Sequence, residues 1–225
     1  MKLLRSILGW ATLGLLGSAG LLLMLVTPSL RWRRRIARFT ARSVLAAAGI
    51  RLTIDAGSTT LDAKLPATCV IVANHTSYLD GVILAAALPP RFGFVIKKEM
   101  SRVPLAGALL RRIGSEFVER HDRRKSAMDA RRVLRRASEG QALVFFPEGT
   151  FSKTPGELLR FHTGAFVTAV RARCSVVPLA IRGAREALGN HGLLVTPGVV
   201  RIEVLQPLIA RPDDPDAAVT LREAA

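Results

Sequence analysis

The chain has 225 residues, and its 33 lysines and arginines outnumber 17 aspartates and glutamates, which gives a formal net charge of +16. This length is enough for one domain with a sizeable core. The charge indicates an anionic partner, which could be nucleic acid, an anionic membrane surface or a phosphorylated small molecule. Aromatic residues make up only 5% and no nucleic-acid-binding motif occurs, so we expect no nucleic-acid partner.

The N-terminal segment is predicted to anchor the chain to a membrane. Residues 6–30 contain no charged side chain and would span about 37 Å as a helix, against a hydrocarbon core of about 30 Å. The arginine-rich stretch that follows favours a retained anchor over a cleaved signal peptide, with the rest of the chain on the cytoplasmic side. We therefore expect residues 1–50 to form a membrane-anchoring helical segment at the cell inner membrane. Two interfacial helices in place of one span remain an open alternative.

The basic stretch itself has the pattern of an interfacial helix. Trp32, Ile36 and Phe39 recur at i, i+4 and i+7. A neighbouring face carries Arg31, Arg35, Arg38 and Arg42. This pattern predicts apolar side chains in the headgroup layer and arginines on anionic lipid. The alternative is a solvated positive flank without lipid specificity.

Residues 51–225 are predicted to form a single domain in which strands alternate with helices. Short apolar or alternating runs predict strands at residues 51–55, 69–73, 92–96, 115–118, 141–146, 175–181 and 199–205. Helical patterns cover residues 78–88, 104–113, 125–138 and 164–173. The alternation predicts an α/β fold, with a central mixed, partly parallel sheet flanked by helices. The tail from residue 211 is polar and is expected to be peripheral.

Residues 74–80 (Asn-His-Thr-Ser-Tyr-Leu-Asp) lie between a predicted buried strand and a predicted helix. Open α/β sheets bind ligands at such junctions. A neutral imidazole at His75 could take a proton near pH 7, and Asp80 could orient it and stabilise its charged form. Because five residues of ideal helix turn through about 500°, His75 must precede the helix if it is to meet Asp80. The structural alternative is a capping box, for which Ser77 and Asp80 have the right spacing.

Neither a metal nor a bound nucleotide is indicated. Cys69 and Cys174 lie far apart in apolar runs, which favours buried free thiols. The four histidines, at positions 75, 121, 162 and 191, lack zinc-binding spacing, so we expect no metal site. Neither a Walker A loop nor a G-x-G-x-x-G motif is present, so nucleotide-binding folds of those kinds are not supported.

Four segments of the chain resemble, in the same order, the sequence motifs of one enzyme family. They are residues 74–80, 114–120 (Gly-Ser-Glu-Phe-Val-Glu-Arg), 146–150 (Phe-Pro-Glu-Gly-Thr) and 176–179 (Val-Val-Pro-Leu). They resemble the His-x4-Asp, Gly-x-x-Phe-Val-x-Arg, Phe-Pro-Glu-Gly-Thr and apolar-Pro motifs of the lysophosphatidic acid acyltransferase family, the 1-acyl-glycerol-3-phosphate acyltransferase-like glycerolipid acyltransferases. The family's Lys-Lys-Glu…Pro…Gly pattern also has a counterpart, in Lys97-Lys98-Glu99, Pro104 and Gly107.

This resemblance implies an enzyme of lipid metabolism. Such an enzyme would move a fatty acyl group from acyl-CoA or acyl-carrier protein to the free hydroxyl of a lysophospholipid. The acceptor implied first is 1-acyl-glycerol-3-phosphate, which gives phosphatidate in phospholipid biosynthesis. His75 would remove the hydroxyl proton, and Asp80 would hold the imidazole tautomer and stabilise the imidazolium. No cofactor is expected beyond the thioester substrate, and residues 51–225 would form the acyltransferase domain.

The resemblance also assigns residues to the acceptor. Arg120 matches the second motif and would bind the phosphate, and Glu148, Gly149 and Thr150 would form the loop that holds the glycerol phosphate. Lys97 is a further candidate for the phosphate. Taken without the resemblance, Arg120 is better explained by a surface salt bridge, and Lys97 fits a solvated strand end as well as a phosphate ligand.

One departure from the family pattern concerns the acceptor. Phe151 stands where many members carry arginine, and Arg160 or His162 would have to compensate if the acceptor is a phosphate. The alternative is another lysolipid acceptor, such as lyso-ornithine lipid. A hypothesis from a different class is a non-catalytic, basic, membrane-tethered binding protein. Acyl-chain length, the choice of thioester and the oligomeric state are not determined by the sequence.

Overall fold

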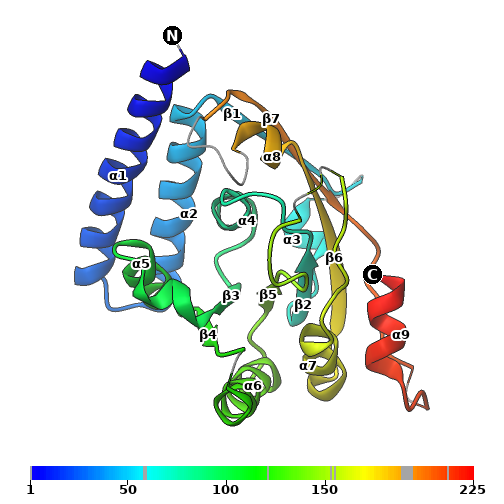
Figure 1. Cartoon of the computed structure of the whole chain (residues 1–225). Helices are drawn as coiled ribbons and strands as arrows, with labels where there is room; N and C mark the ends of the chain where they lie inside the picture. Colours follow the sequence, from blue (N-terminus) through cyan, green and yellow to red (C-terminus); the bar gives the residue numbers. More distant parts are fainter. Residues whose placement is uncertain are drawn as a thin grey trace.

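The computed structural model describes residues 2–57, 60–120, 122–152, 154, 156–188, 195–211 and 213–225 (Figure 1), with the side chains of residues 2–6, 8 and 9 left undescribed. His121 and His191 lie outside these ranges. The helices are α1 Lys2–Val26, α2 Leu30–Ala47, α3 Leu61–Lys64, α4 Asp80–Ala87, η1 Lys98–Arg102 (3-10), α5 Ala106–Arg112, α6 Arg123–Ser138, α7 Gly164–Ala172, α8 Ala184–Ala187 and α9 Ala217–Ala224. The strands are β1 Ile50–Asp55, β2 Cys69–Ala73, β3 Gly93–Lys97, β4 Glu116–Val118, β5 Leu143–Phe145, β6 Ser175–Arg182 and β7 Gly198–Val204.

The strands form one sheet in the order β1-β7-β6-β2-β5-β3-β4. Neighbouring strands are parallel except β6 and β7, which are antiparallel. The predicted mixed, partly parallel sheet of an α/β fold is therefore confirmed. Because β2 runs parallel to both β5 and β6, the segments that follow these three strands leave the sheet at the same edge. The first and third sequence motifs meet there.

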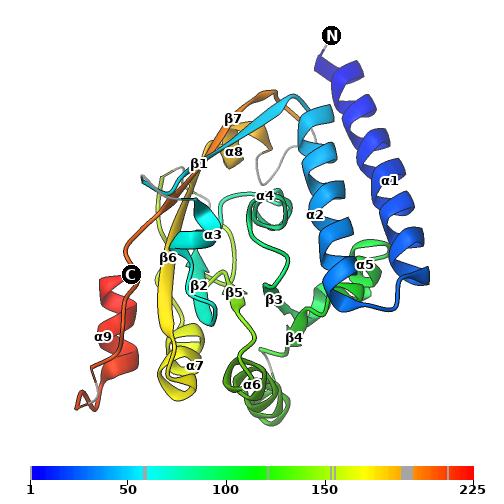
Figure 2. The same cartoon turned by 180° about the vertical axis from the view of Figure 1, so that it is seen from behind.

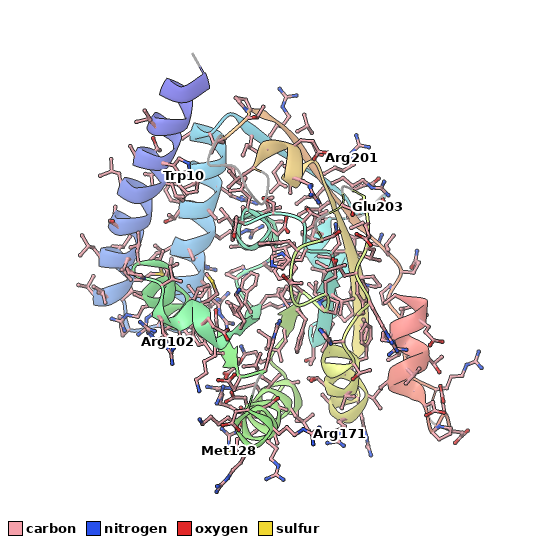
Figure 3. All side chains as sticks on the ribbon, viewed as in Figure 1. Trp10, Arg102, Met128, Arg171, Arg201 and Glu203 are labelled. Atoms are coloured by element: carbon pink, nitrogen blue, oxygen red, sulfur yellow. The ribbon has the colours of Figure 1, made fainter. Side chains whose placement is uncertain are left out.

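Helices cover both faces of the sheet (Figures 1 and 2), which explains why the central strands are continuously apolar. Every residue of β2 is buried. Val70 and Val72 pack in a cluster with Phe166 of α7 and Leu221 of α9. Ile71 faces the opposite way, into the larger core that α2 and α4 help to form. A third cluster joins α6 to β3 and β5, and Figure 3 shows Met128 of α6 and Arg171 of α7 on the outer side of this layer.

The N-terminal segment forms two helices that lie side by side, α1 and α2, and not one continuous helix over residues 6–30. Pro28 lies in the short connection between them, where a proline ends helical hydrogen bonding. Within the described part of the chain, no helix is both long enough and apolar enough to cross a membrane. We call α1 and α2 with their connection the N-terminal hairpin, residues 2–47.

The prediction that Arg31, Arg35, Arg38 and Arg42 all face lipid is wrong for Arg38 and Arg42. Arg38 donates to the carbonyls of Ala86 and Ala87, at 3.3 and 3.0 Å, and Arg42 donates to Ala86 at 2.9 Å. Arg34 reaches two other backbone carbonyls. The free carbonyls at the C-terminal end of α4 attract cations. The basic stretch therefore fastens the hairpin to the helix that begins at Asp80.

The chain after residue 211 is less peripheral than predicted. Ala217 and Leu221 of α9 are buried, and α9 packs against α7. The burial of α9 results from a tertiary contact, because the apolar side of this short helix packs beside α7 over part of the sheet. Elsewhere the predicted elements are present with ends shifted by one or two residues, and α4 starts at Asp80 instead of residue 78.

Candidate active site

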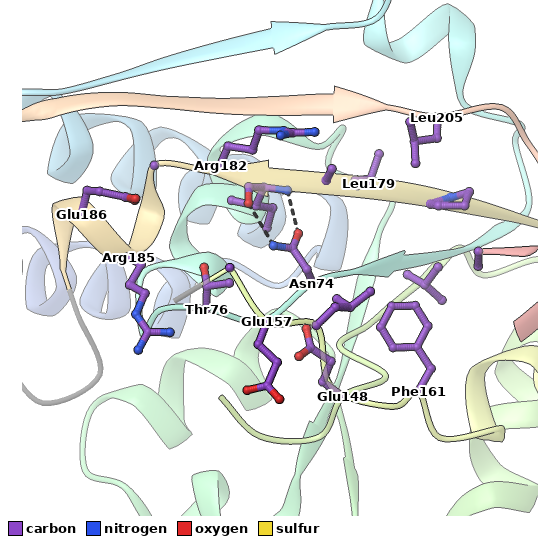
Figure 4. Close-up of a pocket in the computed structure, with 18 residues that line it drawn as sticks. Asn74, Thr76, Glu148, Glu157, Phe161, Leu179, Arg182, Arg185, Glu186 and Leu205 are labelled. Carbon is purple, nitrogen blue, oxygen red and sulfur yellow. Dashed lines mark hydrogen bonds between the residues drawn. The ribbon is translucent and has the colours of Figure 1, made fainter. Parts of the chain in front are cut away.

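The turn after β2 is held by Asn74, to which the sequence assigned no separate role. Its side chain accepts a hydrogen bond from the Ile181 backbone N–H at 2.7 Å and donates to the Ile181 carbonyl at 2.9 Å (Figure 4). The amide group of Asn74 thus imitates a further residue of β2 paired with β6. This pairing fixes the position of His75 relative to the sheet edge.

His75 and Asp80 meet as the turn geometry predicted. His75 precedes α4, and its Nδ1 lies 2.9 Å from Oδ2 of Asp80. The same oxygen accepts the backbone N–H groups of Thr76 at 2.7 Å and Ser77 at 2.9 Å. Because a carboxylate only accepts, Nδ1 carries the proton and Nε2 keeps a lone pair. The imidazole is therefore oriented with a basic nitrogen directed away from Asp80.

The capping alternative is not confirmed as a capping box, because the N-cap of α4 is Leu79 and no side chain caps the helix there. Ser77 and Asp80 instead stabilise the turn before the helix. Ser77 Oγ accepts from the Leu79 backbone N–H at 3.1 Å, while Asp80 accepts from the Ser77 N–H. Ser77 and Asp80 are both fully buried. Asp80 thus holds the turn that precedes α4 and orients His75 in one arrangement.

Aromatic rings enclose the imidazole of His75. The ring of Phe146 stacks on it, with centroids 4.1 Å apart and an interplanar angle of 16°. Phe151 contacts it at 4.2 Å and 57°, and also meets Tyr78 edge-on at 4.8 Å. Phe151, which stands in place of the family's arginine, is therefore part of the wall around His75. The side chain of His75 remains 21% exposed.

Glu148 is placed beside the same turn and uses both of its oxygens on the backbone. Oε1 accepts from the His75 N–H at 2.7 Å, and Oε2 accepts from the Leu159 N–H at 3.0 Å. Only 4% of Glu148 is exposed, and burial raises its pKa, although the two backbone hydrogen bonds oppose the rise. The geometry therefore ties Glu148 to the backbone of the turn that carries His75, whereas the family resemblance assigned it to the acceptor. The sequence carries no signal for this use, because the two donors lie 73 and 11 residues away.

Gly149 is where the second and third motifs converge. Its φ of +74° is a conformation that side chains rarely adopt. Arg120 Nη1 donates to its carbonyl at 2.7 Å. A Cβ added to Gly149 would lie 2.7 Å from that nitrogen and 3.2 Å from the ring of His162. Arg120 and His162 therefore flank one backbone position.

The remaining candidates are peripheral to this network. Thr150 and Arg160 are exposed. Lys97 is exposed at the end of β3, and among the described residues it has no ion-pair partner. Their assignment to the acceptor stays a prediction.

The described part of the chain has no cluster of metal-ligand side chains and no thiol with a lowered pKa. In the described ranges, no three histidine, cysteine or acidic side chains are grouped as metal ligands would be. Cys69 and Cys174 are free thiols, as predicted. Burial raises the pKa of the Cys69 thiol to about 12, so this thiol stays protonated at neutral pH.

The chain is similar in sequence to known proteins. A sequence profile of the family described as Acyltransferase matches residues 58–182, which is more than half of the chain. A chloroplast 1-acyl-sn-glycerol-3-phosphate acyltransferase from Brassica napus is 32% identical over 142 residues, which are 62% of this chain and 40% of that protein. A lyso-ornithine lipid O-acyltransferase from Pseudomonas aeruginosa is 34% identical over 158 residues, 61% of this chain and 58% of that protein. The chain thus spans about half the length of these relatives.

The fold also has a solved counterpart. The crystal structure of the 1-acyl-sn-glycerophosphate acyltransferase from Thermotoga maritima superposes with a TM-score of 0.79, covering 99% of this chain and 92% of that one. The sequence identity is 18%, so this likeness shows the fold alone. Because the family profile covers more than half of the chain, including residues 74–80, the Gly149 loop and most of β6, the chain belongs to the Acyltransferase family.

Proposed function

We propose that the protein is an O-acyltransferase that moves a fatty acyl group from acyl-CoA or acyl-carrier protein to the free hydroxyl of a lysolipid. The observation that carries this proposal is the hydrogen bond between His75 Nδ1 and Asp80, which leaves Nε2 as a base in a partly exposed aromatic pocket. Attack of a hydroxyl on a thioester needs such a base, and general base catalysis contributes about 10²–10⁴-fold.

The proposed reaction is a direct transfer. His75 Nε2 takes the proton as the acceptor oxygen bonds to the thioester carbonyl carbon. The C–S bond then breaks, and the thiolate leaves and regains a proton from the imidazolium. Asp80 stabilises the imidazolium while it lasts. The reaction uses neither a metal nor a cofactor besides the thioester.

The first acceptor we propose is 1-acyl-glycerol-3-phosphate, with phosphatidate as the product. Its support is the Brassica relative's name and the convergence of Arg120 and His162 on Gly149. Arginine and protonated histidine are suited to phosphate oxygens. Thr150 and Lys97 are the further residues that we propose for this headgroup.

A second acceptor, a lyso-ornithine lipid, is favoured by one specific observation. Phe151 packs on His75 and Tyr78, so an aromatic ring occupies a position where many family members carry arginine. The Pseudomonas relative is named for this acceptor. The reacting group would again be a hydroxyl, and only the headgroup would differ.

We also propose that the N-terminal hairpin attaches the acyltransferase domain, residues 51–225, to the cytoplasmic face of the inner membrane. Large apolar side chains remain exposed along both helices: Ile7, Leu15, Leu22, Leu23, Leu25, Val26, Trp32 and Phe39. Exposed apolar patches of this kind mark membrane or protein contacts. An interfacial position would bring the active site to its lipid substrate.

The test is acyl transfer by the purified protein in lipid vesicles, with free CoA followed after addition of acyl-CoA and each lysolipid. Wild type should release CoA only when acceptor is present, and His75→Ala should lower kcat by about 10²–10⁴-fold. His162→Ala is the matched control, because the His162 ring lies beside Gly149 and is not part of the His75–Asp80 pair. This variant should change the acceptor KM more than kcat. Near wild-type kcat in His75→Ala would contradict the mechanism.

A further inference from the structure

The short helix α8 is fixed to the end of the sheet, beside the turn that follows β2. Both of its alanines are buried. It follows Gly183, whose φ is +85°, and a Cβ added there would collide with a backbone carbonyl oxygen of β7. After the helix, the Leu188 carbonyl accepts a hydrogen bond from Ser77 Oγ of the turn at 2.6 Å. Helix α8 therefore has a defined position relative to the turn.

Arg185 of α8 holds the loop after β5. Its Nη1 donates to the backbone carbonyls of Ser152 and Thr154, at 3.2 Å each. Ser152 is only 2% exposed. Its hydroxyl donates to Glu157 Oε2 at 2.7 Å and accepts from the Thr154 N–H at 3.0 Å. These hydrogen bonds close the loop on itself, and Arg185 ties the closed loop to α8.

Phe151 lies between two anchored points of this loop. Before it, the Gly149 carbonyl accepts a hydrogen bond from Arg120. After it, the carbonyl of the next residue accepts one from Arg185. The Phe151 ring between these points contacts the imidazole of His75, with centroids 4.2 Å apart. The position of the ring over the imidazole therefore depends on both anchors.

We propose that Arg185 is a positioning residue that holds Phe151 over His75 and so keeps water away from the base. This role rests on the acyl transfer proposed above. A base that activates a lysolipid hydroxyl can also activate water, and a closed site suppresses such side reactions. The His75 side chain is already 21% exposed, so displacement of the Phe151 ring would open it further.

The side reaction would be hydrolysis of the thioester. His75 Nε2 takes a proton from water as the water oxygen bonds to the thioester carbonyl carbon. The C–S bond breaks, and the thiolate regains the proton from the imidazolium. The products are a free fatty acid and CoA, so CoA release without a lysolipid measures how well the site excludes water.

The experiment measures CoA release by the full chain from acyl-CoA, with and without lysolipid. Arg185→Ala should raise the release without lysolipid by about three- to tenfold and lower kcat for transfer by a similar factor, because one hydrogen-bonded anchor is lost. Arg185→Lys keeps a cationic donor and should restore most of the wild-type ratio of the two rates.

Arg182→Ala is the matched control. It removes the same charge from an exposed side chain that pairs with Glu203. The side chains of Arg182 and Arg185 point in different directions (Figure 4), so this variant should change neither rate. Equal changes in the Arg182→Ala and Arg185→Ala variants would assign the effect to the lost charge and overturn the positioning role.

A second pair of variants tests whether Arg185 acts through Phe151. Phe151→Ala should itself raise CoA release without lysolipid, and addition of Arg185→Ala should cause no further rise. Access to the imidazole is measured without turnover, as the rate at which diethyl pyrocarbonate modifies His75, resolved by peptide mass spectrometry. That rate should rise in both single variants. If Arg185→Ala does not unfold cooperatively in urea, Glu157→Ala loosens the same loop from an exposed position and should give a smaller rise.

The possible results separate the positioning role from the acyl transfer. Wild-type hydrolysis and a wild-type modification rate in Arg185→Ala would overturn the positioning role and leave the acyl transfer standing. Additive rises in the double variant would overturn the link to Phe151. Absence of CoA release with every lysolipid would overturn the proposed function and, with it, the exclusion of water from a reacting base.

Discussion

The turn that carries His75 and Asp80, residues 74–80, and the N-terminal hairpin, residues 2–47, place their charged groups in opposite ways. At the turn, the buried carboxylate of Asp80 accepts hydrogen bonds from the imidazole and the backbone, and the buried carboxylate of Glu148 accepts one from the His75 backbone. In the hairpin, Arg38 and Arg42 donate to the last carbonyls of α4, while apolar side chains stay exposed. Buried carboxylates thus fix the position of His75, the proposed base, and arginines hold the hairpin to the other end of the helix that begins at Asp80. The two regions should respond differently to substitution.

The largest effect is expected in the turn, at Asp80. Asp80→Ala removes the acceptor of three hydrogen bonds, so kcat should fall by about 10²–10⁴-fold. Leaving buried donors unpaired should also lower the free energy of unfolding by about 1–3 kcal/mol. Steady-state kinetics and urea unfolding measure the two losses.

Asp80→Asn separates charge from hydrogen bonding. The amide oxygen can still accept from Thr76 and Ser77, so most of the stability should remain, while the charge that stabilises the imidazolium is lost. We expect kcat to fall nearly as far as in Asp80→Ala. An Asp80→Asn variant with full activity would show that Asp80 serves only to hold the turn before α4.

The next effect is expected at Glu148, which holds the turn from the neighbouring strand. Glu148→Gln leaves one acceptor oxygen for two backbone donors, so it should lower the free energy of unfolding by about 1–3 kcal/mol. Because the His75 backbone shifts when its acceptor is lost, kcat should fall more than the acceptor KM rises. A rise in KM alone, at constant kcat, would return Glu148 to the acceptor-binding role that the family resemblance implies.

The pH dependence of stability gives a second measure of Glu148. Burial raises its pKa above the ordinary value of 4.5, so the folded chain binds more protons than the unfolded chain. The contribution of Glu148 to the free energy of unfolding is therefore complete below pH 4.5 and is lost as the pH rises through the folded-state pKa. Glu148→Gln does not titrate and should lack this loss. Urea unfolding of both proteins between about pH 4 and 7 makes the comparison.

A smaller effect is expected where the hairpin meets α4. Arg38→Gln removes hydrogen bonds to Ala86 and Ala87. Because the Arg38 side chain is partly solvated, the free energy of unfolding should fall by at most about 1.5–3 kcal/mol. Arg31→Gln, at an exposed position of the same helix, is the control and should change stability by less than about 0.5 kcal/mol. Equal losses in the two variants would mean that charge alone, and not the contact with α4, stabilises the hairpin.

The smallest effect on stability is expected on the outer side of the hairpin. Phe39 is 73% exposed, so Phe39→Ser should leave the free energy of unfolding within about 0.5 kcal/mol of wild type. Because the proposed membrane contact uses this side, the same change should weaken binding to anionic vesicles in a flotation assay. Unaltered vesicle binding in a Phe39→Ser, Leu15→Ser double variant would remove these side chains from the proposed interface.

Much of the domain follows from local patterns. The apolar runs at residues 69–73 and 175–181 became buried strands because each is apolar on both faces, as strands covered by helices must be. The spacing of His75 and Asp80 required the imidazole to precede the helix, and α4 does begin at Asp80. The connection between α1 and α2 also has a local cause, because Pro28 lies just after the end of α1 at Val26. The uncharged run of residues 6–30 had instead suggested a single membrane span.

The sequence by itself determined which segments become strands and helices and which two residues can act as base and partner, because these depend on contacts within a few residues. Only the tertiary structure decided that Glu148 serves the His75 backbone, that Arg38 caps α4, and that Phe151 packs on the imidazole. Each of these contacts joins segments far apart in the chain, and a charged or aromatic side chain has many partners of suitable chemistry. Which partner it meets depends on the order of the strands, and no local pattern specifies that order.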